Sequence, residues 1–208
     1  VEAIKKVVGF IKANRSKGVD IEYLNIGGGL GIIYSHEVPQ TAAEFAAKVL
    51  PILKASGLKI IMEPGRFIIG SAAVLVTRVL YVKKTPLKKF VIVDAGMNDL
   101  IRPSLYDAHH QIVPLIDSGR SAEKVDVVGP ICESGDFLAK DRALPKVEEG
   151  EYLAVMCAGA YGFSMSSNYN SRRRAAEILV KDKKISVIRK RETVNDLIRN
   201  EISSSKFK

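Results

Sequence analysis

The sequence predicts an α/β protein built from two parts. Up to about residue 70, two amphipathic helices alternate with two short apolar strands, which is the rhythm of a parallel βα architecture. After Arg66 the pattern changes to strands separated by turns, so the second part is expected to be mostly β. The 208 residues, 47% hydrophobic and 26% charged, suit one large domain or two small ones. We place the boundary near residues 70 to 75, which gives parts of residues 1–72 and 73–208.

The first part begins with a helix over residues 1 to about 14, because apolar residues recur there at helical spacing: Ile4, Val7, Val8 and Ile11. Gly18 helps to end this helix, and a short strand over residues 21–26 follows. A second helix is expected over residues 41–55, with Pro51 as a point where it can bend. A strand over residues 58–62 completes the order helix, strand, helix, strand.

The second part opens with a pattern that resembles a hairpin, in which an apolar run over residues 72–82 turns at residues 85–87 into a strand over residues 90–93. Further strands are expected at residues 111–116, 124–128, 152–157, 177–180 and 185–189, the last two being joined through residues 181–184. Thr193 and Asp196 have the spacing of a capping box, so a closing helix is expected over residues 194–200.

Charge and hydropathy exclude some classes of function. The net charge is +9, but basic residues are scattered apart from residues 172–174 and 181–191, and the aromatic-basic interleaving of single-strand binders is absent, so no nucleic-acid partner is expected. No apolar run approaches the roughly 20 residues of a membrane-spanning helix, and no secretory signal is visible. We therefore expect a cytoplasmic protein without a membrane partner. The chain begins at Val1 rather than methionine, so we also expect a fragment.

Two motifs follow the strands of the first part and are candidates for anion binding. Residues 27–31, Gly-Gly-Gly-Leu-Gly, allow backbone N–H groups to close around a phosphate, although a tight turn is the alternative; neither a dinucleotide fingerprint nor a P-loop fits them. Residues 63–66, Glu-Pro-Gly-Arg, could hold a basic ring nitrogen and an anion, or form an ion pair across a turn. Two candidate anion sites at adjacent strand ends favour a phosphorylated cofactor.

The second part carries an arginine and two tyrosines as candidates for ligand binding. Arg102 and Tyr106 lie about one helical turn apart, and an arginine fork suits an amino-acid carboxylate; a surface arginine beside a packed tyrosine is the alternative. Tyr161 lies among small residues that let a ligand approach, or is a sheet-edge aromatic. His109 and His110 are expected in a loop or at the surface, since adjacent histidines point apart, and no metal site is expected.

Residues 128–136, Val-Gly-Pro-Ile-Cys-Glu-Ser-Gly-Asp, set a thiol beside a carboxylate in a turn-forming frame, which we expect to lie outside the core. Cys157 is the only other cysteine, so neither a disulfide framework nor a thiolate-rich metal site can form. Acid or nucleophile chemistry at Cys132 is one hypothesis, and a half-buried structural thiol is the other.

Five motifs, in this order, resemble those of the meso-diaminopimelate decarboxylase family, pyridoxal-phosphate enzymes related to alanine racemase and ornithine decarboxylase. They are the glycine loop, EPGR, NDLIRPSLYDA, VGPICESGD and AGAYGFSMSSNYNSR, and the resemblance extends over essentially the whole chain. The resemblance implies that residues 1–72 are the closing part of a (β/α)₈ barrel and that residues 73–208 are a β-rich, barrel- or sandwich-like C-terminal domain. It also implies pyridoxal 5′-phosphate as cofactor and decarboxylation of meso-2,6-diaminopimelate to L-lysine.

The same resemblance implies roles for individual residues. The cofactor would be bound by Gly27, Gly28, Gly29, Glu63, Pro64, Gly65, Arg66 and Tyr161, with the carboxylate facing the pyridine nitrogen. The substrate would be bound by Arg66, Arg102, Tyr106, Glu133 and Tyr161. Of these, Arg66, Arg102 and Tyr106 would hold its distal carboxylate and Glu133 its distal ammonium. Cys132 would be the catalytic residue that protonates the substrate carbon after carbon dioxide leaves.

A homodimer is implied, because in the family the residues matching Cys132 and Glu133 reach into the neighbouring subunit's site. The family's cofactor lysine has no match in this chain: Lys12 lies in a helix too close to the glycine loop, so these 208 residues alone are expected to be inactive. Two alternatives stay open. One is a related ornithine- or carboxynorspermidine-type decarboxylase, and the other is a catalytically dead relative that dimerises with a partner and regulates it.

Overall fold

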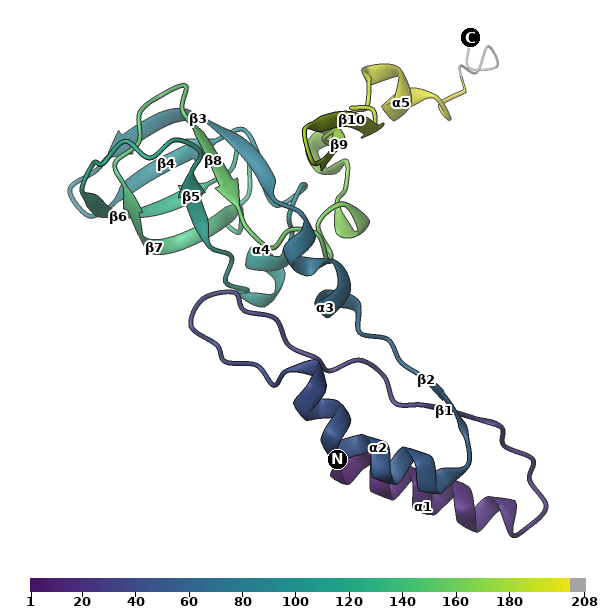
Figure 1. Cartoon of the computed structure of the whole chain (residues 1–208). Helices are drawn as coiled ribbons and strands as arrows, with labels where there is room; N and C mark the ends of the chain where they lie inside the picture. Colours follow the sequence, from purple (N-terminus) through teal and green to yellow (C-terminus); the bar gives the residue numbers. More distant parts are fainter. Residues whose placement is uncertain (203–208) are drawn as a thin grey trace. The chain divides into compact units, whose positions relative to one another are not determined.

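The structure, a computed structural model, describes residues 1–202, and the chain divides into two compact units at Ala72 and Ala73 (Figure 1). In the first unit, α1 (Glu2–Arg15) and α2 (Ala42–Ser56) pack against each other and against two short parallel strands, β1 (Tyr23–Asn25) and β2 (Lys59–Ile61). The buried side chains between them are apolar and come from all these elements except β2: Val8, Ile11, Leu24, Val49 and Leu53. The predicted order of helix, strand, helix and strand is confirmed.

The ends of α2 are determined by local sequence. Thr41 and Glu44 form a capping box, in which the Glu44 backbone N–H donates to Thr41 Oγ1 at 3.2 Å and the Thr41 N–H donates to Glu44 Oε2 at 2.8 Å. At the other end Gly57 has a φ of 66°, a left-handed conformation that glycine adopts without strain. Pro51 lies inside the helix without ending it. Strand β2 begins two residues after Gly57, so the end of α2 also determines the position of residues 63–66, which follow β2.

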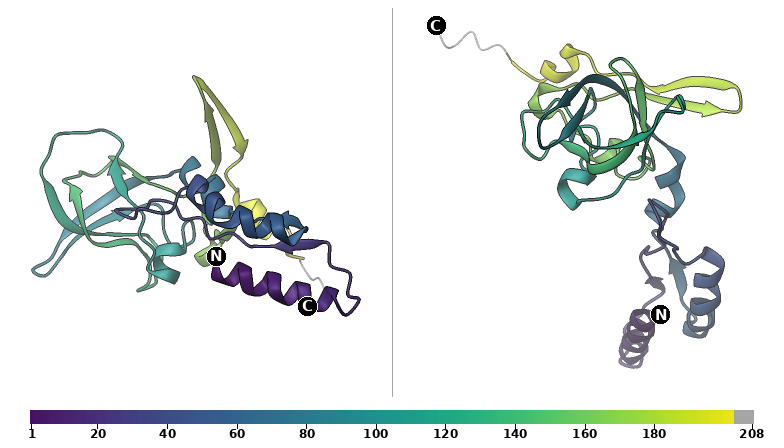
Figure 2. Two further views of the ribbon diagram at one scale, coloured as in Figure 1. Left: turned by 60° about the horizontal axis from the view of Figure 1, so that its bottom comes forward. Right: turned by 90° about the vertical axis from the view of Figure 1, so that its left-hand side faces the viewer.

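The second unit is built on a mixed sheet of six strands in the order β5-β8-β3-β4-β6-β7. These strands are β3 (Leu75–Lys84), β4 (Lys89–Val93), β5 (Ile112–Pro114), β6 (Ala122–Val128), β7 (Phe137–Pro145) and β8 (Tyr152–Val155). All neighbours are antiparallel except β4 and β6. The sheet curls until its two edges, β5 and β7, approach each other, and an end view shows the strands enclosing an interior (Figure 2).

The interior of this curled sheet is filled by apolar side chains, so it is a packed core and not a channel. The fully buried ones are Val79, Val91, Val93, Leu100, Val127, Leu138, Leu144, Leu153 and Val155. Between the two sheet edges, Arg142 Nη1 on β7 donates to the backbone oxygen of His110, just before β5, at 2.6 Å. The sheet is therefore nearly closed by backbone pairing, and a side chain bridges the remaining gap.

Short helices and a hairpin complete the described chain. Two short helices, α3 (Gly65–Ile69) and η1 (Gly70–Ala72), end the first unit; α4 (Arg102–Tyr106), η2 (Phe163–Met165) and η3 (Tyr169–Ser171) belong to the second. The antiparallel pair β9 (Glu177–Lys181) and β10 (Lys184–Arg189) and the closing helix α5 (Val194–Ile198) follow. The capping box at α5 is confirmed, with the Asp196 N–H donating to Thr193 Oγ1 at 3.2 Å and the Thr193 N–H donating to Asp196 Oδ2 at 2.7 Å.

One strand was missed by the sequence analysis, and the start of another was wrong. Strand β7 was not predicted, because its register against β6 shifts twice and Asp141 has a φ of 49°, so buried and exposed residues do not alternate along it. The strand expected from residue 72 begins only at Leu75, because residues 65–72 form α3 and η1. In the first unit the described residues pair two parallel strands, and no closed (β/α)₈ barrel was expected of them. No helix of residues 1–202 is long and apolar enough to cross a membrane.

Candidate functional site

The glycine loop follows the end of β1 and lies directly beside Glu63, two residues past the end of β2. Gly27 and Gly29 have φ values of 68° and 86°, which favour glycine. A Cβ on Gly28 would come closer than 3.0 Å to the backbone oxygen of Glu63. The Glu63 N–H also donates to the Gly27 oxygen at 2.8 Å. Glycine is required at Gly28 because the two strand ends approach too closely for a side chain there, and at Gly27 and Gly29 because of their left-handed backbone.

Glu63 is held by a residue that the sequence analysis did not single out. Asn25 Nδ2 donates to Glu63 Oε1 at 2.5 Å, while Asn25 Oδ1 accepts from the Gly27 N–H at 2.8 Å. One amide therefore couples the carboxylate to the glycine loop. The Gly65 N–H donates to the Glu63 backbone oxygen at 2.8 Å and closes the turn through Pro64, and Arg66, the second residue of α3, is exposed. The predicted residues of the first unit are thus brought together at one pair of strand ends.

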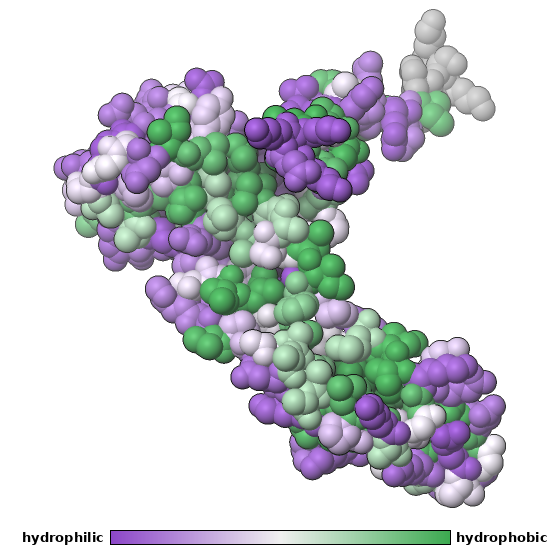
Figure 3. Space-filling view, viewed as in Figure 1, coloured by the Kyte–Doolittle hydropathy of each residue, from purple (hydrophilic) through white to green (hydrophobic). Residues whose placement is uncertain are grey.

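An apolar groove lies beside these residues within the first unit. It encloses about 690 Å³ between α2 and β2, and it is lined by residues such as Leu30, Phe45, Leu53, Ile60 and Met62. Apolar side chains also lie on the surface of this unit, where Ile61 is 44% and Ile68 69% exposed (Figure 3). The groove lacks the convergent polar groups of a cofactor site, so the glycine loop and Glu63 are the better candidates for ligand binding.

In the second unit, Arg102 lies at the start of α4 and is 7% exposed. His110 Nδ1 donates to the Met156 backbone oxygen at 2.9 Å, so His110 Nε2 accepts from Arg102 Nη1 at 2.9 Å. Burial lowers the pKa of His110, and the cationic Arg102 and Arg142 lower it further, against the bond to Met156. Both histidines lie in a loop, as expected, and His109 is exposed, but His110 is buried, so its ring lies in the interior, where it orients Arg102.

The structure excludes the alternative of a surface Arg102 beside a packed Tyr106, because the burial of the two residues is the reverse. The arginine is buried, and the tyrosine, one turn later, is 62% exposed. Asp107 ends α4 in a left-handed conformation with a φ of 51°. Within α4, Ser104 Oγ donates to the Gly135 backbone oxygen at 2.6 Å and so attaches this helix to the loop that carries Cys132.

Cys132 and Glu133 lie on the loop of residues 129–136, which joins β6 to β7. Both side chains are exposed, while Ile131 on one side and Asp136 on the other are buried at 7% and 5% exposure. The expectation that this segment lies outside the core is therefore correct for its centre and wrong for its ends. An exposed thiol beside an exposed carboxylate is available to a ligand, and a half-buried structural thiol is excluded for Cys132.

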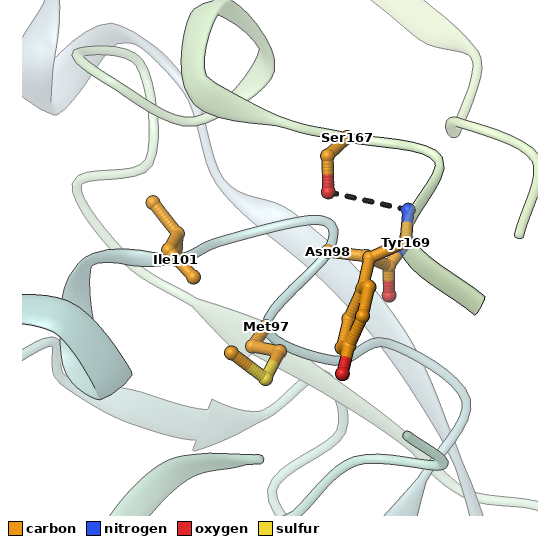
Figure 4. Close-up of a pocket in the computed structure, with 5 residues that line it drawn as sticks. All are labelled: Met97, Asn98, Ile101, Ser167 and Tyr169. Carbon is orange, nitrogen blue, oxygen red and sulfur yellow. Dashed lines mark hydrogen bonds between the residues drawn. The ribbon is translucent and has the colours of Figure 1, made fainter. Parts of the chain in front are cut away.

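Tyr169 is a further residue at this loop that sequence reasoning missed. Its hydroxyl donates to Glu133 Oε2 at 3.2 Å, and this bond raises the pKa of Tyr169. Tyr169 also lines a pocket of about 510 Å³ with Met97, Asn98, Ile101 and Ser167 (Figure 4). The run Asn-Tyr-Asn-Ser at residues 168–171 could have indicated an irregular turn here. In the structure Asn170 and Ser171 both have left-handed conformations in η3.

Tyr161 lies on a separate loop that follows β8. It has a φ of 61° and Cys157, at the start of the same loop, has a φ of 57°. A Cβ on Gly162 would come closer than 3.0 Å to the Ala158 backbone oxygen, so the loop folds tightly back on itself. Strained backbone of this kind concentrates at ligand sites, and the Tyr161 ring is 45% exposed. The second unit thus presents Cys132, Glu133 and Tyr169 together, with Arg102 attached through α4 and Tyr161 on its own loop.

Comparison with known proteins identifies a family and several relatives. Residues 21–159 match the family described as pyridoxal-dependent decarboxylase, C-terminal sheet domain. A diaminopimelate decarboxylase from Aquifex aeolicus is 52% identical over 201 residues, covering 95% of this chain and 47% of the relative. One from Pseudomonas aeruginosa is 47% identical over 201 residues, covering 97% of this chain and 48% of the relative.

Solved structures give the same picture. The crystal structure of diaminopimelate decarboxylase from Helicobacter pylori complexed with L-lysine matches with a TM-score of 0.88 and 46% identity, covering 95% of this chain and 49% of that one. The chain therefore spans about half the length of the relatives that it matches.

Proposed function

The chain belongs to the pyridoxal-dependent decarboxylase family, and from this premise we propose that the protein containing it converts meso-2,6-diaminopimelate to L-lysine and carbon dioxide. The observation that carries the proposal is that the second unit contains both Arg102 and Glu133. Arg102 is on α4, and the hydrogen bond from Ser104 attaches this helix to the loop that carries Glu133. A guanidinium fork suits the substrate's distal carboxylate, and a carboxylate suits its distal ammonium. The names of the relatives, and the lysine bound in one of them, support this substrate and product.

The first unit fits pyridoxal 5′-phosphate as cofactor. The loop of Gly27, Gly28 and Gly29 would enclose the phosphate, with the N–H groups of Gly28 and Gly29 as donors, because the Gly27 N–H already donates to Asn25 Oδ1 and the Gly65 N–H to the Glu63 backbone oxygen. Pro64 and Gly65 would support the loop from the neighbouring strand end. When bound, the cofactor supplies the electron sink for loss of carbon dioxide. Glu63, oriented by Asn25, would hold a proton at the ring nitrogen.

The substrate would be held and protonated by the side chains to which the family resemblance assigns these roles. Arg66, Arg102 and Tyr106 would bind its distal carboxylate, Glu133 its distal ammonium, and Tyr161 would contact both cofactor and substrate. The Cys132 thiol would then pass its proton from Sγ to the substrate carbon that has lost carbon dioxide. Exposure of Cys132 supports this role, because a proton donor must reach the substrate.

We propose that the first unit is the closing part of a (β/α)₈ barrel, followed by residues 73–208 as the C-terminal domain. The parallel pairing of β1 and β2 supports this, because a barrel is built from parallel strands that alternate with helices. So does exposure along β2, where none of the three residues is buried, since additional strands would cover them.

We also propose a homodimer in which Cys132 and Glu133 act in the partner's site. Mixed dimers test this. Glu63→Gln and Cys132→Ala subunits, each inactive alone, should recover about a quarter of wild-type activity after random mixing, because half the dimers then contain one intact shared site. Absence of recovery, with heterodimers demonstrated by mass spectrometry, would show that each site uses its own thiol.

The substrate is tested with the full-length protein loaded with pyridoxal phosphate. Carbon dioxide release is measured from meso-diaminopimelate, ornithine and carboxynorspermidine at equal concentrations. The proposal predicts turnover of meso-diaminopimelate with L-lysine as product. Preference for either other amine supports a related decarboxylase instead, and turnover of none supports a regulatory relative.

A further inference from the structure

The Asp136 carboxylate, at the end of the loop of residues 129–136, is unusually well enclosed. Its residue is 5% exposed, and each oxygen accepts one backbone hydrogen bond: Oδ1 from the Met97 N–H and Oδ2 from the Ile131 N–H, both at 2.6 Å. Short bonds from two N–H groups to two separate oxygens need a carboxylate, because a carboxamide presents one acceptor only. Asp136 therefore ties two loops of the second unit to each other.

Two glycines make room for this carboxylate. A Cβ on Gly96 would lie 2.9 Å from Asp136 Oδ1, and a Cβ on Gly129 would meet both carboxylate oxygens and lie 2.6 Å from the Gly96 Cα. Neither glycine is among those with a positive φ, so space and not backbone conformation requires them. The sequence thus reserves three positions, 96, 129 and 136, for a single contact.

The contact lies next to the residues assigned to the chemistry. Ile131, whose N–H donates to the Asp136 carboxylate, immediately precedes Cys132. Two backbone bonds also close the loop: the Gly129 N–H donates to the Asp136 backbone oxygen at 3.2 Å, and the Asp136 N–H donates to the Glu133 backbone oxygen at 3.0 Å. Cys132 and Glu133 themselves are exposed. Their backbone is consequently held from both ends, while their side chains remain available to a ligand.

We propose that Asp136 is a positioning residue, which aligns the Cys132 thiol by fixing the loop on which it lies. The expected effect on kcat rests on the proposed function, whereas the ordering of residues 129–136 by Asp136 does not. A misplacement of about 1 Å can cost about 100-fold in rate, so a local contact is sufficient to matter. Loss of the contact should leave the curled sheet and its core intact.

The test is Asp136→Asn in the full-length, cofactor-loaded protein, with Asp117→Asn as the matched control. Asp117 is exposed, and its Oδ1 accepts from the Gly119 N–H at 2.9 Å, a bond that an amide oxygen preserves. Hydrogen exchange should accelerate about tenfold or more in residues 96–98 and 129–136 of the Asp136 variant only, since a hydrogen bond to a charged group is lost. Unchanged exchange there would overturn the positioning role, whether or not the protein decarboxylates anything.

A double-mutant cycle separates positioning of Cys132 from a general structural effect. Asp136→Asn should lower kcat about 10- to 100-fold in the wild-type background and add no further loss in a Cys132→Ala background, where alignment of the thiol no longer matters. Equal losses in both backgrounds would contradict the proposal. If hydrogen exchange accelerates locally in Asp136→Asn but the wild-type protein shows no turnover, the proposed function is contradicted and the structural role of Asp136 is still supported.

If Asp136→Asn does not fold, Gly96→Ala replaces it. Its methyl group would press on the carboxylate from 2.9 Å and displace it less severely. The same local exchange and the same dependence on Cys132 are expected, and exchange that rises throughout the second unit would refute a local role.

Discussion

The two units differ in how completely they bury the residues that support their sites. In the second unit the curled sheet encloses a continuous core, and Val93, Leu144 and Leu153 are 0% exposed. In the first unit two helices cover two short strands, and β2 contributes no buried residue. In each unit, nevertheless, hydrogen bonds between neighbouring segments hold candidate residues in place, such as Asn25 to Glu63 in the first unit and Tyr169 to Glu133 in the second. The second unit therefore orders its loops on a nearly closed sheet, whereas the first orders its glycine loop mainly through contacts between the ends of β1 and β2.

Removing the thiol is expected to have the largest effect. Cys132→Ala in the full-length protein should lower kcat by about 10²–10⁴-fold, the range for a lost general acid, because the substrate carbon loses its proton donor. The cofactor's absorbance should persist, since the glycine loop is in the other unit. Cys157→Ser is the control with a far smaller effect expected, and steady-state turnover of meso-diaminopimelate is the measurement. Unchanged turnover in Cys132→Ala would remove the thiol from the mechanism.

Core truncation tests the contrast in burial directly. Leu153→Ala, at a fully buried position of β8, should lower the free energy of unfolding by about 2–5 kcal/mol because it leaves a cavity. Ile61→Ala, at a position of β2 that is 44% exposed, should cost about 1 kcal/mol or less. Urea denaturation of the two variants measures both. Equal losses would mean that β2 is covered by other parts of the protein as fully as β8 is by its own sheet.

A single methyl group probes the glycine loop of the first unit. Gly28→Ala places a Cβ against the Glu63 backbone oxygen and must push the two strand ends apart. Such overpacking costs about 1–3 kcal/mol, so affinity for pyridoxal phosphate should fall about tenfold or more. Gly9→Ala is the matched control, since nothing lies within 4 Å of its added Cβ. Absorbance titration with the cofactor compares them, and equal affinities would show that the loop does not hold the phosphate.

A smaller, pH-dependent effect is expected where the segment after β10 binds the loop near Tyr169. Arg174 Nε and Nη2 donate to Glu192 Oε1 at 2.8 and 2.6 Å, and Asn168 Nδ2 donates to Oε2 at 2.6 Å. The Arg174 bonds, with smaller help from Asn168, lower the pKa of Glu192 to about 2 from its ordinary 4.5. Because the folded-state pKa is depressed, this stabilisation is fully present above pH 4.5 and is lost as the pH falls toward 2.

Glu192→Gln should therefore lower the free energy of unfolding by about 1 kcal/mol at neutral pH, after allowance for solvent screening. The difference in melting temperature between this variant and the wild type should narrow as the pH is lowered from 4.5 toward 2. A difference that stays constant over this range would show that the ionised carboxylate is not the stabilising group.

Much of the fold was predictable, because apolar spacing and capping residues act locally. The helix over residues 41–55 and the capping box at Thr193 follow from neighbours in sequence, and the structure confirms both. Strand β7 was not predictable by alternation, since its bulges are set by pairing with β6. The register shifts become visible only when both strands are placed together.

The site shows the same division. Cys132 and Glu133 stand out because a thiol beside a carboxylate is unusual in a turn, and the glycine loop stands out because three consecutive glycines directly follow a strand. His110, Tyr169 and Asp136 bind Arg102, Glu133 and Met97, which lie 8, 36 and 39 positions away. Asp136 also binds Ile131 five positions away, but no residue pattern in the sequence predicted these pairings. Supporting residues of this kind depend on the tertiary fold.

The most direct test of the central claim, that the second unit reads the distal amino-acid head group, is the kcat/KM of Glu133→Gln for meso-diaminopimelate. This change keeps the shape of the side chain and removes the charge that would bind the substrate's ammonium. Loss of one partner from such a charge pair costs about 2–5 kcal/mol, so kcat/KM should fall about 30-fold or more while cofactor binding is retained. An unchanged kcat/KM would contradict the assignment of Glu133 and with it the proposed substrate.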